Sequence, residues 1–255
     1  MLRPLRRTKT TNPMQLIYGF DNIPELLHPV VTVGSYDGLH KGHQILISRL
    51  IACAKSRGGV SVVLTFEPHP RITLGQDEGL KLLTSLEEKQ LLLERLGVDY
   101  LVVIPFDKAF SQLSNEQFVN DYLIGKLAAE EIVIGYNHHF GRDKSGDYNY
   151  LCSEQPTLAV TQVEQQTVES DKVSSTVVRG VISAGDMVAA NRLLGHSYII
   201  IGTSNAEGRI VADKYKLLPP SGSYRAVVNG VEQSITICDN EIYTDRPSEK
   251  VIIEL

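Results

Sequence analysis

Several features are scarce in this 255-residue sequence, and each scarcity argues against a class of protein. There is no tryptophan, and the three cysteines, Cys53, Cys152 and Cys238, lie far apart without a C-x-x-C pair. We therefore expect neither a disulfide framework nor a cysteine zinc site. No apolar run approaches the roughly 20 residues needed to cross a bilayer, which argues against a membrane protein. The formal net charge of −5 argues against binding of nucleic acid, because nucleic-acid binders are normally basic.

The N-terminal segment lacks the apolar core that a signal peptide would carry. We interpret residues 1–13, which are basic, as a disordered tail, with Met14 as an alternative start. Because scattered cysteines suit a reducing compartment, we expect a cytoplasmic protein. Nothing in the sequence points to an obligate protein partner or to attachment to a membrane.

Strand-like and helix-like segments alternate between Val30 and about Val163. The apolar runs predict strands at Val30–Val33, Val60–Phe66, Tyr100–Ile104, Glu131–Ile134 and Leu158–Val163. Helices are predicted between them, over 44–55 and after the capping-box sequences that begin at Ser85 and Ser114. Such alternation is typical of an α/β fold, in which helices cover both faces of a mostly parallel sheet.

The pattern changes after Gly195 to short alternating segments separated by glycine, proline and asparagine. The predicted strands are Tyr198–Ile201, Arg209–Val211, Tyr224–Val228, Gln233–Cys238 and Lys250–Ile253. The dipeptide Asn229-Gly230 between two apolar runs is a strong hairpin signal. We therefore divide the chain into an α/β domain at 14–195 and a small all-β, barrel-like module at 196–255.

The sequence Gly34-Ser-Tyr-Asp-Gly-Leu-His-Lys-Gly-His43 lies where the first predicted strand ends and a helix begins. Backbone N–H groups and the positive end of the helix dipole gather at such a point, and together they bind anionic phosphate. His40 and His43 are three residues apart and therefore share a helix face. Gly42 between them lets a phosphate chain approach the backbone closely. The segment resembles the H-x-G-H signature of nucleotidyltransferases, which move a nucleoside monophosphate from ATP or CTP to an acceptor.

Two other interpretations of the histidines stay open at this point. A histidine near the start of a helix can cap it, and a histidine pair can form half of a metal site. Supporting metal ligands are lacking, because the cysteines are scattered along the chain. A capping role would not require the glycines that stand on either side of His40.

Further polar segments follow other predicted elements. Phe66-Glu-Pro-His-Pro70 follows the second strand, and Gly135-Tyr-Asn-His-His-Phe-Gly141 follows the fourth. Because the carboxyl ends of parallel strands meet at one edge of a sheet, we expect both segments to join the histidine motif in one ligand site. A fourth motif, Ser174-Ser-Thr-Val-Val-Arg179, offers hydroxyl groups for a helix cap and an arginine one turn further on. Alone, this last motif indicates no more than a capped helix with an exposed arginine.

Together the four motifs resemble those of the bacterial bifunctional riboflavin kinase/FMN adenylyltransferase family, the FAD synthetases. The resemblance covers residues 14–195 and implies a Rossmann-like nucleotidyltransferase domain. It also implies ATP and FMN as substrates, Mg²⁺ as cofactor, and FAD and pyrophosphate as products. The Mg²⁺ would be carried mainly by the ATP phosphates, and no residue of the chain is a certain metal ligand.

The resemblance also implies roles for particular residues. His40 and His43 would donate to the α-phosphate and Arg179 would bind the leaving pyrophosphate, so these three are the catalytic candidates. The candidates for ATP and phosphate binding are Gly34, Tyr36, Asp37, Gly42, Ser175 and Thr176. The candidates near FMN or the metal are Glu67, His69, Asn137 and Phe140.

The C-terminal module departs from the family pattern. In the family's kinase half, a G-R pair is followed by a P-T-A-N-type motif that serves ATP and Mg²⁺, whereas Gly208-Arg209 is followed here by Ile-Val-Ala-Asp-Lys214. The segment with the family's catalytic glutamate is also missing before Leu255. We therefore expect a shortened, degenerate kinase half without riboflavin kinase activity. Two alternatives to FMN adenylyl transfer stay open: transfer to another phosphorylated acceptor, and a catalytically weak flavin-binding regulatory protein.

Overall fold

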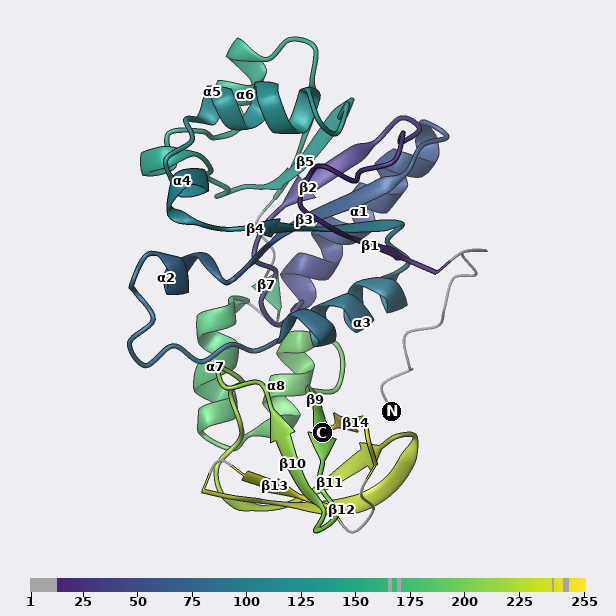
Figure 1. Cartoon of the computed structure of the whole chain (residues 1–255), viewed down its shortest axis with the longest axis vertical. Helices are drawn as coiled ribbons and strands as arrows, with labels where there is room; N and C mark the ends of the chain where they lie inside the picture. The colour runs from purple at the N-terminus through teal and green to yellow at the C-terminus, as the bar shows by residue number, and fades with distance from the viewer. Residues whose placement is uncertain (1–12, 165–166, 169–170, 240, 245–247) are drawn as a thin grey trace.

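The chain folds into a parallel sheet with covering helices and a smaller β-barrel (Figure 1). The computed structural model describes residues 13–164, 167–168, 171–239, 241–244 and 248–255. Residues 1–12 of the predicted tail therefore lie outside the described residues. The α/β fold with a parallel sheet and the barrel-like module are both confirmed.

Six parallel strands form the sheet, in the order β1-β4-β3-β2-β5-β6. Their bounds are β1 (Gln15–Tyr18), β2 (Val30–Val33), β3 (Ser61–Glu67), β4 (Tyr100–Pro105), β5 (Glu131–Gly135) and β6 (Ala159–Val163). The chain moves outward from β2 through β3 to β4, and then returns to place β5 on the other side of β2. The strand order therefore reverses between β2 and β5, which is where ligands bind in open α/β sheets.

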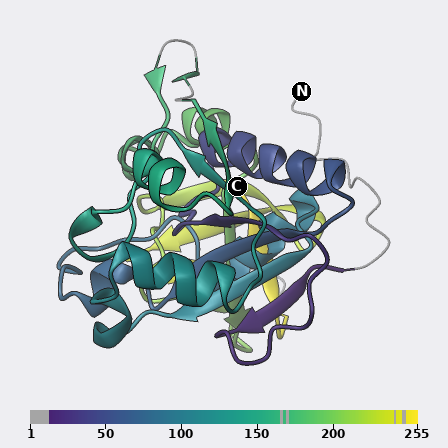
Figure 2. The same ribbon diagram turned by 90° about the horizontal axis from the view of Figure 1, so that it is seen from above.

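Helices cover both faces of the sheet, as predicted (Figure 2). They are α1 (Lys41–Ser56), α3 (Leu86–Leu96), α5 (Asn115–Gln117), the π-helix η1 (Phe118–Ile124) and α6 (Tyr148–Glu154). Ile47 of α1 and Leu92 of α3 pack with Val63 on one face of the sheet. Leu123 of η1 and Leu151 of α6 pack on the other face. The central strands are buried on both faces, which explains why they read as nearly continuous apolar runs.

The helix starts predicted from the capping boxes at Ser85 and Ser114 are also confirmed. Ser85 caps α3 by accepting from the N–H of Glu88 at 3.2 Å, while the Glu88 carboxylate accepts from the N–H of Ser85 at 2.8 Å. Gly97 ends the helix in the left-handed conformation, with a φ of +87°. Ser114 and Gln117 form the same box at the start of α5, which continues directly into η1.

The barrel closes with six antiparallel strands, in the order β10-β13-β12-β11-β14-β9. Their bounds are β9 (Ile199–Ser204), β10 (Arg209–Ala212), β11 (Gly222–Val228), β12 (Val231–Cys238), β13 (Glu241–Tyr243) and β14 (Val251–Glu254). Helices α7 (Ser175–Ser183) and α8 (Met187–Leu194) connect the sheet to the barrel and lie between the two in Figure 1. The predicted Asn229-Gly230 turn joins β11 to β12, with φ values of +47° and +83°.

The sequence pattern misses several short elements. β1 has four residues and precedes the alternating pattern, yet it adds an edge strand parallel to β4. β13 has three residues, too few for a period to be recognised. The same reason applies to α2 (Pro70–Thr73), α4 (Lys108–Ser111), the 3-10 helix η2 (Arg142–Lys144), β7 (Thr167–Val168) and β8 (Asp171–Lys172).

Candidate active site

A cleft of about 680 Å³ opens at the carboxyl ends of β2 and β5, where the strand order reverses. Its walls come from the loops after β2, β3 and β5 and from the start of α7, so the polar segments meet at one edge of the sheet. The predicted site residues that line it are Gly34, Tyr36, His40, Gly42, His43, His69, Asn137 and Ser175. The position agrees with the rule that ligands of open α/β sheets bind at the switch point.

The two motif histidines stack at the N-terminus of α1. His40 caps the helix, because its Nδ1 accepts from the backbone N–H of His43 at 3.4 Å. The two rings stack with their centroids 3.7 Å apart, and the Tyr36 ring meets His43 edge-on at 5.3 Å. Since Nδ1 of a neutral His40 accepts, its proton is on Nε2. The capping interpretation therefore holds for His40, and Nε2–H is the ring's remaining donor.

Both rings are held in the neutral form. Burial lowers the pKa of His40 from 6.5 to about 4, although the Asp37 carboxylate opposes the change. Burial lowers the pKa of His43 well below 6.5, and the charges of His40 and Lys89 add to this effect. Burial also lowers the pKa of His138, on the cleft wall, to about 4. These three histidines therefore offer the cleft neutral ring N–H groups rather than positive charges.

Two histidine nitrogens on the cleft wall lack a protein partner. Nδ1 of His43 and Nε2 of His138 are buried and make no hydrogen bond to any described residue. Buried polar atoms are normally satisfied, so such atoms at a cleft are typical of a site that a polar ligand completes.

The neutral histidines predict that the fold is sensitive to acid. The folded pKa values of His40 and His138 lie below the unfolded value, so the unfolded chain binds more protons between pH 6.5 and about 4. Stability therefore falls as the pH is lowered through that range, by up to about 3 kcal/mol for each ring. Urea unfolding at about pH 7.5, 6 and 4.5 measures the change, and His40→Asn should reduce the slope. An unfolding midpoint that stays constant over this range would contradict the prediction.

Two motif glycines lie close against aromatic rings, where a side chain would be tight. A Cβ atom at Gly42 would lie 3.3 Å from the ring of His40, and one at Gly34 would lie 3.0 Å from the ring of Tyr36. Tyr36 is itself buried, with its hydroxyl 2.7 Å from Oγ1 of Thr32 and a φ of +47°. These residues therefore shape the cleft by fixing the positions of the rings.

Asp37 and Arg179 form an ion pair beside the cleft rather than on its wall. Oδ1 of Asp37 accepts from the N–H groups of Leu83 and Thr84, each at 2.9 Å, and Oδ2 pairs with Arg179 at 2.6 Å. Arg179 also donates through Nε to the carbonyl of Lys81 at 2.8 Å. The ion pair therefore connects the motif loop before α1 to residues 81–84, which precede α3.

Thr176 and Phe140 also lie away from the cleft wall. Thr176 is exposed in the first turn of α7, whereas Ser175 lines the cleft and donates from Oγ to the carbonyl of Asp37 at 2.9 Å. Phe140 is buried in the core beside Phe118, with 5.9 Å between ring centroids. Of the fourth motif's two predicted hydroxyls, the structure therefore brings only that of Ser175 to the cleft.

With this geometry in place, the sequence can be compared with known proteins. The family model of FAD synthetase matches residues 23–177, which include both motif histidines. The chain belongs to the FAD synthetase family.

Curated relatives in this family are longer than the chain. The bifunctional riboflavin kinase/FMN adenylyltransferase of Listeria monocytogenes is 38% identical over 179 residues, which cover 69% of this chain and 57% of the relative. The protein of the same name from Bacillus subtilis is 34% identical over 216 residues, which cover 79% and 68%. The Escherichia coli protein is 31% identical over 193 residues, which cover 74% and 62%. The match to the Listeria protein thus spans a little over half of its length.

A solved structure shares both parts of the fold. The macrolide-efflux protein from Streptococcus pneumoniae has a TM-score of 0.81 and 25% identity, with 94% of this chain and 89% of that chain covered. The likeness includes the sheet and the barrel, so this two-part architecture occurs in a second protein. In the part of the chain that the structure describes, no helix is both long and apolar enough to span a bilayer.

A smaller chamber of about 70 Å³ adjoins the cleft of this FAD synthetase family member. Ser35, Phe66 and His69 line both spaces. Glu67 lines the chamber and not the cleft, and burial raises the pKa of its carboxyl group. His69 caps α2 through Nδ1, and burial lowers the pKa of its ring. Residues 66–70 therefore contribute to the walls of both spaces.

Lys89 is the main residue of this region that the sequence patterns do not single out. Its Nζ is buried at the chamber wall and donates to Oγ1 of Thr65 at 2.9 Å. Burial lowers its pKa from 10.5 to about 8, while Asp37 and Glu67 oppose the change. The available signal is its position on α3, one turn from Leu86, on a face that is otherwise apolar. His138, His139 and Ser174, which also line the cleft, stand within motifs already recognised.

Proposed function

We propose that this protein is an FMN adenylyltransferase, which transfers AMP from ATP to FMN and releases FAD and pyrophosphate. The observation that carries the proposal is the stacked, neutral pair His40 and His43 at the N-terminus of α1, on the wall of a cleft at the switch point of the sheet. Membership of the FAD synthetase family supports FMN as the acceptor.

In this reaction a phosphate oxygen of FMN attacks the α-phosphorus of ATP, and the bond from that phosphorus to the bridging oxygen of the pyrophosphate breaks. The FMN phosphate is largely dianionic at neutral pH, since its second pKa is about 6, so the attack needs no general base. The protein has to align the reactants and stabilise charge on the equatorial oxygens. The N–H groups at the start of α1, Nε2–H of His40 and the ring of His43 supply the donors.

Mg²⁺ would neutralise charge on the ATP phosphates. Among the described residues, no group of three or more histidine, cysteine, aspartate or glutamate side chains could hold a metal ion. We therefore propose that the ATP phosphates carry the ion. The lack of such a group among the described residues also disfavours the interpretation of His40 and His43 as half of a metal site. The resemblance assigns contact with it to the oxygens of Asn137, on the cleft wall, and Glu67, in the chamber, and oxygen ligands suit the preference of Mg²⁺.

The direct test is incubation of the purified protein with ATP, MgCl₂ and FMN. We expect FAD and pyrophosphate to form in equal amounts, and neither to form when FMN is omitted. A panel of other phosphorylated acceptors with ATP or CTP tests the alternative of a different substrate. Tight binding of FMN or FAD without turnover would instead support a flavin-binding regulatory protein.

Riboflavin kinase activity is expected to be absent. Phosphoryl transfer to a hydroxyl needs a fixed Mg²⁺ and a group that orients the nucleophile. Val211 and Ala212 belong to strand β10, and the N–H of Tyr215 binds back to Asp213, so a P-T-A-N-type metal loop has no counterpart here. Riboflavin supplied with ATP and Mg²⁺ should give no FMN above a protein-free control. Formation of FMN at a rate comparable to that of FAD would show that the barrel is a working kinase.

A cytoplasmic location is part of the proposal. The structure records Cys53, Cys152 and Cys238 as free thiols, and the last two are exposed, which suits a reducing compartment.

A further inference from the structure

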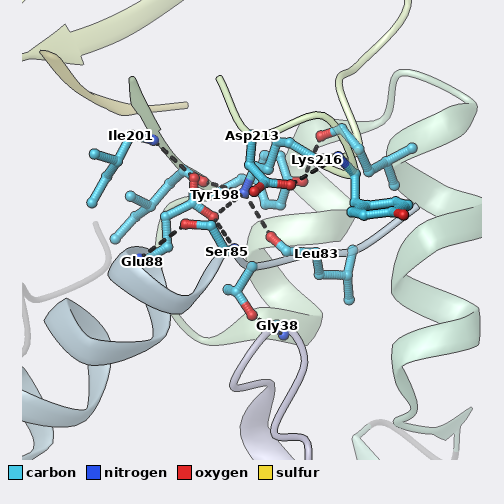
Figure 3. A network of polar contacts seen from close by, with 12 residues as sticks. Gly38, Leu83, Ser85, Glu88, Tyr198, Ile201, Asp213 and Lys216 are labelled. Atoms are coloured by element: carbon cyan, nitrogen blue, oxygen red, sulfur yellow. Dashed lines mark hydrogen bonds and ion pairs between the residues drawn. The ribbon is translucent and has the colours of Figure 1, made fainter. Parts of the chain in front are cut away.

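A fully buried ammonium group lies where the barrel contacts the α/β domain (Figure 3). Lys216 lies between β10 and β11, and its Nζ donates to Oε2 of Glu88 at 2.6 Å and to the carbonyl of Leu83 at 2.6 Å. A third bond, of 2.5 Å, goes to the carbonyl of Ile199 in β9. The ammonium also lies 4.2 Å from the centroid of the Tyr198 ring. All three N–H donors of Lys216 are therefore used, two of them across the interface.

The contacts of Lys216 are part of a wider attachment. The N–H of Leu82 donates to the carbonyl of Tyr215 at 2.7 Å, and the N–H of Leu217 donates back to the carbonyl of Leu82 at 2.8 Å. The second oxygen of Glu88 accepts from the N–H of Ile201 at 2.8 Å. The barrel thus holds residues 82–88, the segment that starts α3, from one side.

The same segment holds the catalytic motif from its other side. The N–H groups of Leu83 and Thr84 donate to Oδ1 of Asp37, and Oγ1 of Thr84 accepts from the N–H of Gly38 at 3.0 Å. Leu83 is fully buried, with its carbonyl bound to the barrel and its N–H bound to Asp37. Because Asp37 pairs with Arg179, Leu83 links the barrel's ammonium to this ion pair beside the cleft.

We propose that Lys216 of the barrel is a positioning residue for adenylyl transfer: by fixing the carbonyl of Leu83 and the carboxylate of Glu88, it holds Asp37 and Arg179 in place. The inference rests on the proposed function. The barrel, which lacks the kinase motif, would then have a role in the active site of the α/β domain. Lysine is suited to this role, since removal of a buried cation leaves the Glu88 carboxylate uncompensated and forces residues 82–88 to move.

The experiment compares Lys216→Met with Ile237→Ala, a control in β12, whose strand neighbours are β11 and β13. Both variants destabilise the barrel, and the comparison is made well below both melting temperatures. For Lys216→Met we expect kcat for FAD formation to fall about 10- to 100-fold, because a small displacement of aligned groups has effects of this size. The KM values for ATP and FMN should change less than about threefold, since the alignment matters mainly in the transition state. Ile237→Ala should keep kcat within about twofold of the parent.

A second readout does not depend on activity. Hydrogen exchange of the Leu83 and Thr84 amides, which donate to Asp37, should accelerate in Lys216→Met and not in Ile237→Ala. If Lys216→Met does not fold, Glu88→Gln replaces it, because it keeps the shape of the side chain and removes the charge that pairs with Lys216. An unchanged kcat together with unchanged exchange at Leu83 and Thr84 would overturn the inference. If the parent protein forms no FAD, the proposed function fails, and amide exchange alone decides whether Lys216 orders the Asp37 site.

Discussion

Replacement of His43 by alanine is expected to lower kcat for FAD formation by about 10²- to 10³-fold, the usual loss for one donor to a transition state. The free energy of unfolding should fall by only about 1 kcal/mol, a typical value for a single substitution. The ring lies on the cleft wall, stacks on His40, and keeps Nδ1 without a hydrogen-bond partner among the described residues. A donor to the transition state acts only when charge develops on the phosphate, so its loss appears in kcat and much less in folding. Steady-state kinetics and urea unfolding measure the two effects separately.

His28→Asn is the matched control for that variant. His28 lies just before β2, at the amino end of the strands and therefore at the edge opposite the cleft. It is exposed, pairs with Glu130 at 2.6 Å, and has a φ of +41°, a conformation that asparagine tolerates. This variant should keep the kcat of the parent protein. If His43→Ala also kept it, His43 would have only a packing role beside the helix cap of His40.

The parts of the fold that local pattern dictates were predictable from the sequence. Val30–Val33 was predicted to the residue, because a β-branched run between a proline and a glycine leaves little choice of register or ends. The box at Ser85 marks the start of α3 for a similar reason, since the two side-chain bonds lie within four residues. The sequence of β1 carries no local signal of this kind. Its four residues become a strand through pairing with β4, 85 positions further along the chain at Gln15 and Tyr100.

Some residues of the candidate site were likewise predictable from the local sequence, and others were not. His40, Gly42 and His43 could be recognised because their relative placement is set by one helix turn. The bond from Leu83 to Asp37 spans 46 positions and that from Arg179 to Asp37 spans 142, so no local pattern contains them. Buried lysines were missed for another physical reason. A lysine is normally solvated, and only the tertiary structure shows that Lys216 is surrounded by acceptors.

The ion pair of Arg179 with Asp37 leaves other donors of the arginine for its proposed contact with pyrophosphate. The contacts to Asp37 and to the carbonyl of Lys81 use two of the five N–H donors of the guanidinium. About a quarter of the Arg179 side chain is exposed, at 26%, whereas Asp37 is buried. The carboxylate therefore orients the guanidinium while its remaining donors stay available for a phosphate in the bidentate geometry that arginine favours.

Arg179→Lys is accordingly expected to lower kcat/KM by about 10²-fold, although the positive charge is retained. A lysine ammonium can pair with Asp37, but it cannot also make the Nε bond to Lys81 and present a planar pair of donors to pyrophosphate. Arg95→Lys is the control, because Arg95 makes a single 2.5 Å contact to Glu254 that a lysine can reproduce. In the reverse direction, from FAD and pyrophosphate to ATP and FMN, the KM for pyrophosphate should rise in Arg179→Lys and stay unchanged in Arg95→Lys. If kcat/KM equalled that of the parent, a positive charge paired with Asp37 would be sufficient. Arg179 would then stabilise the motif loop without contacting the leaving group.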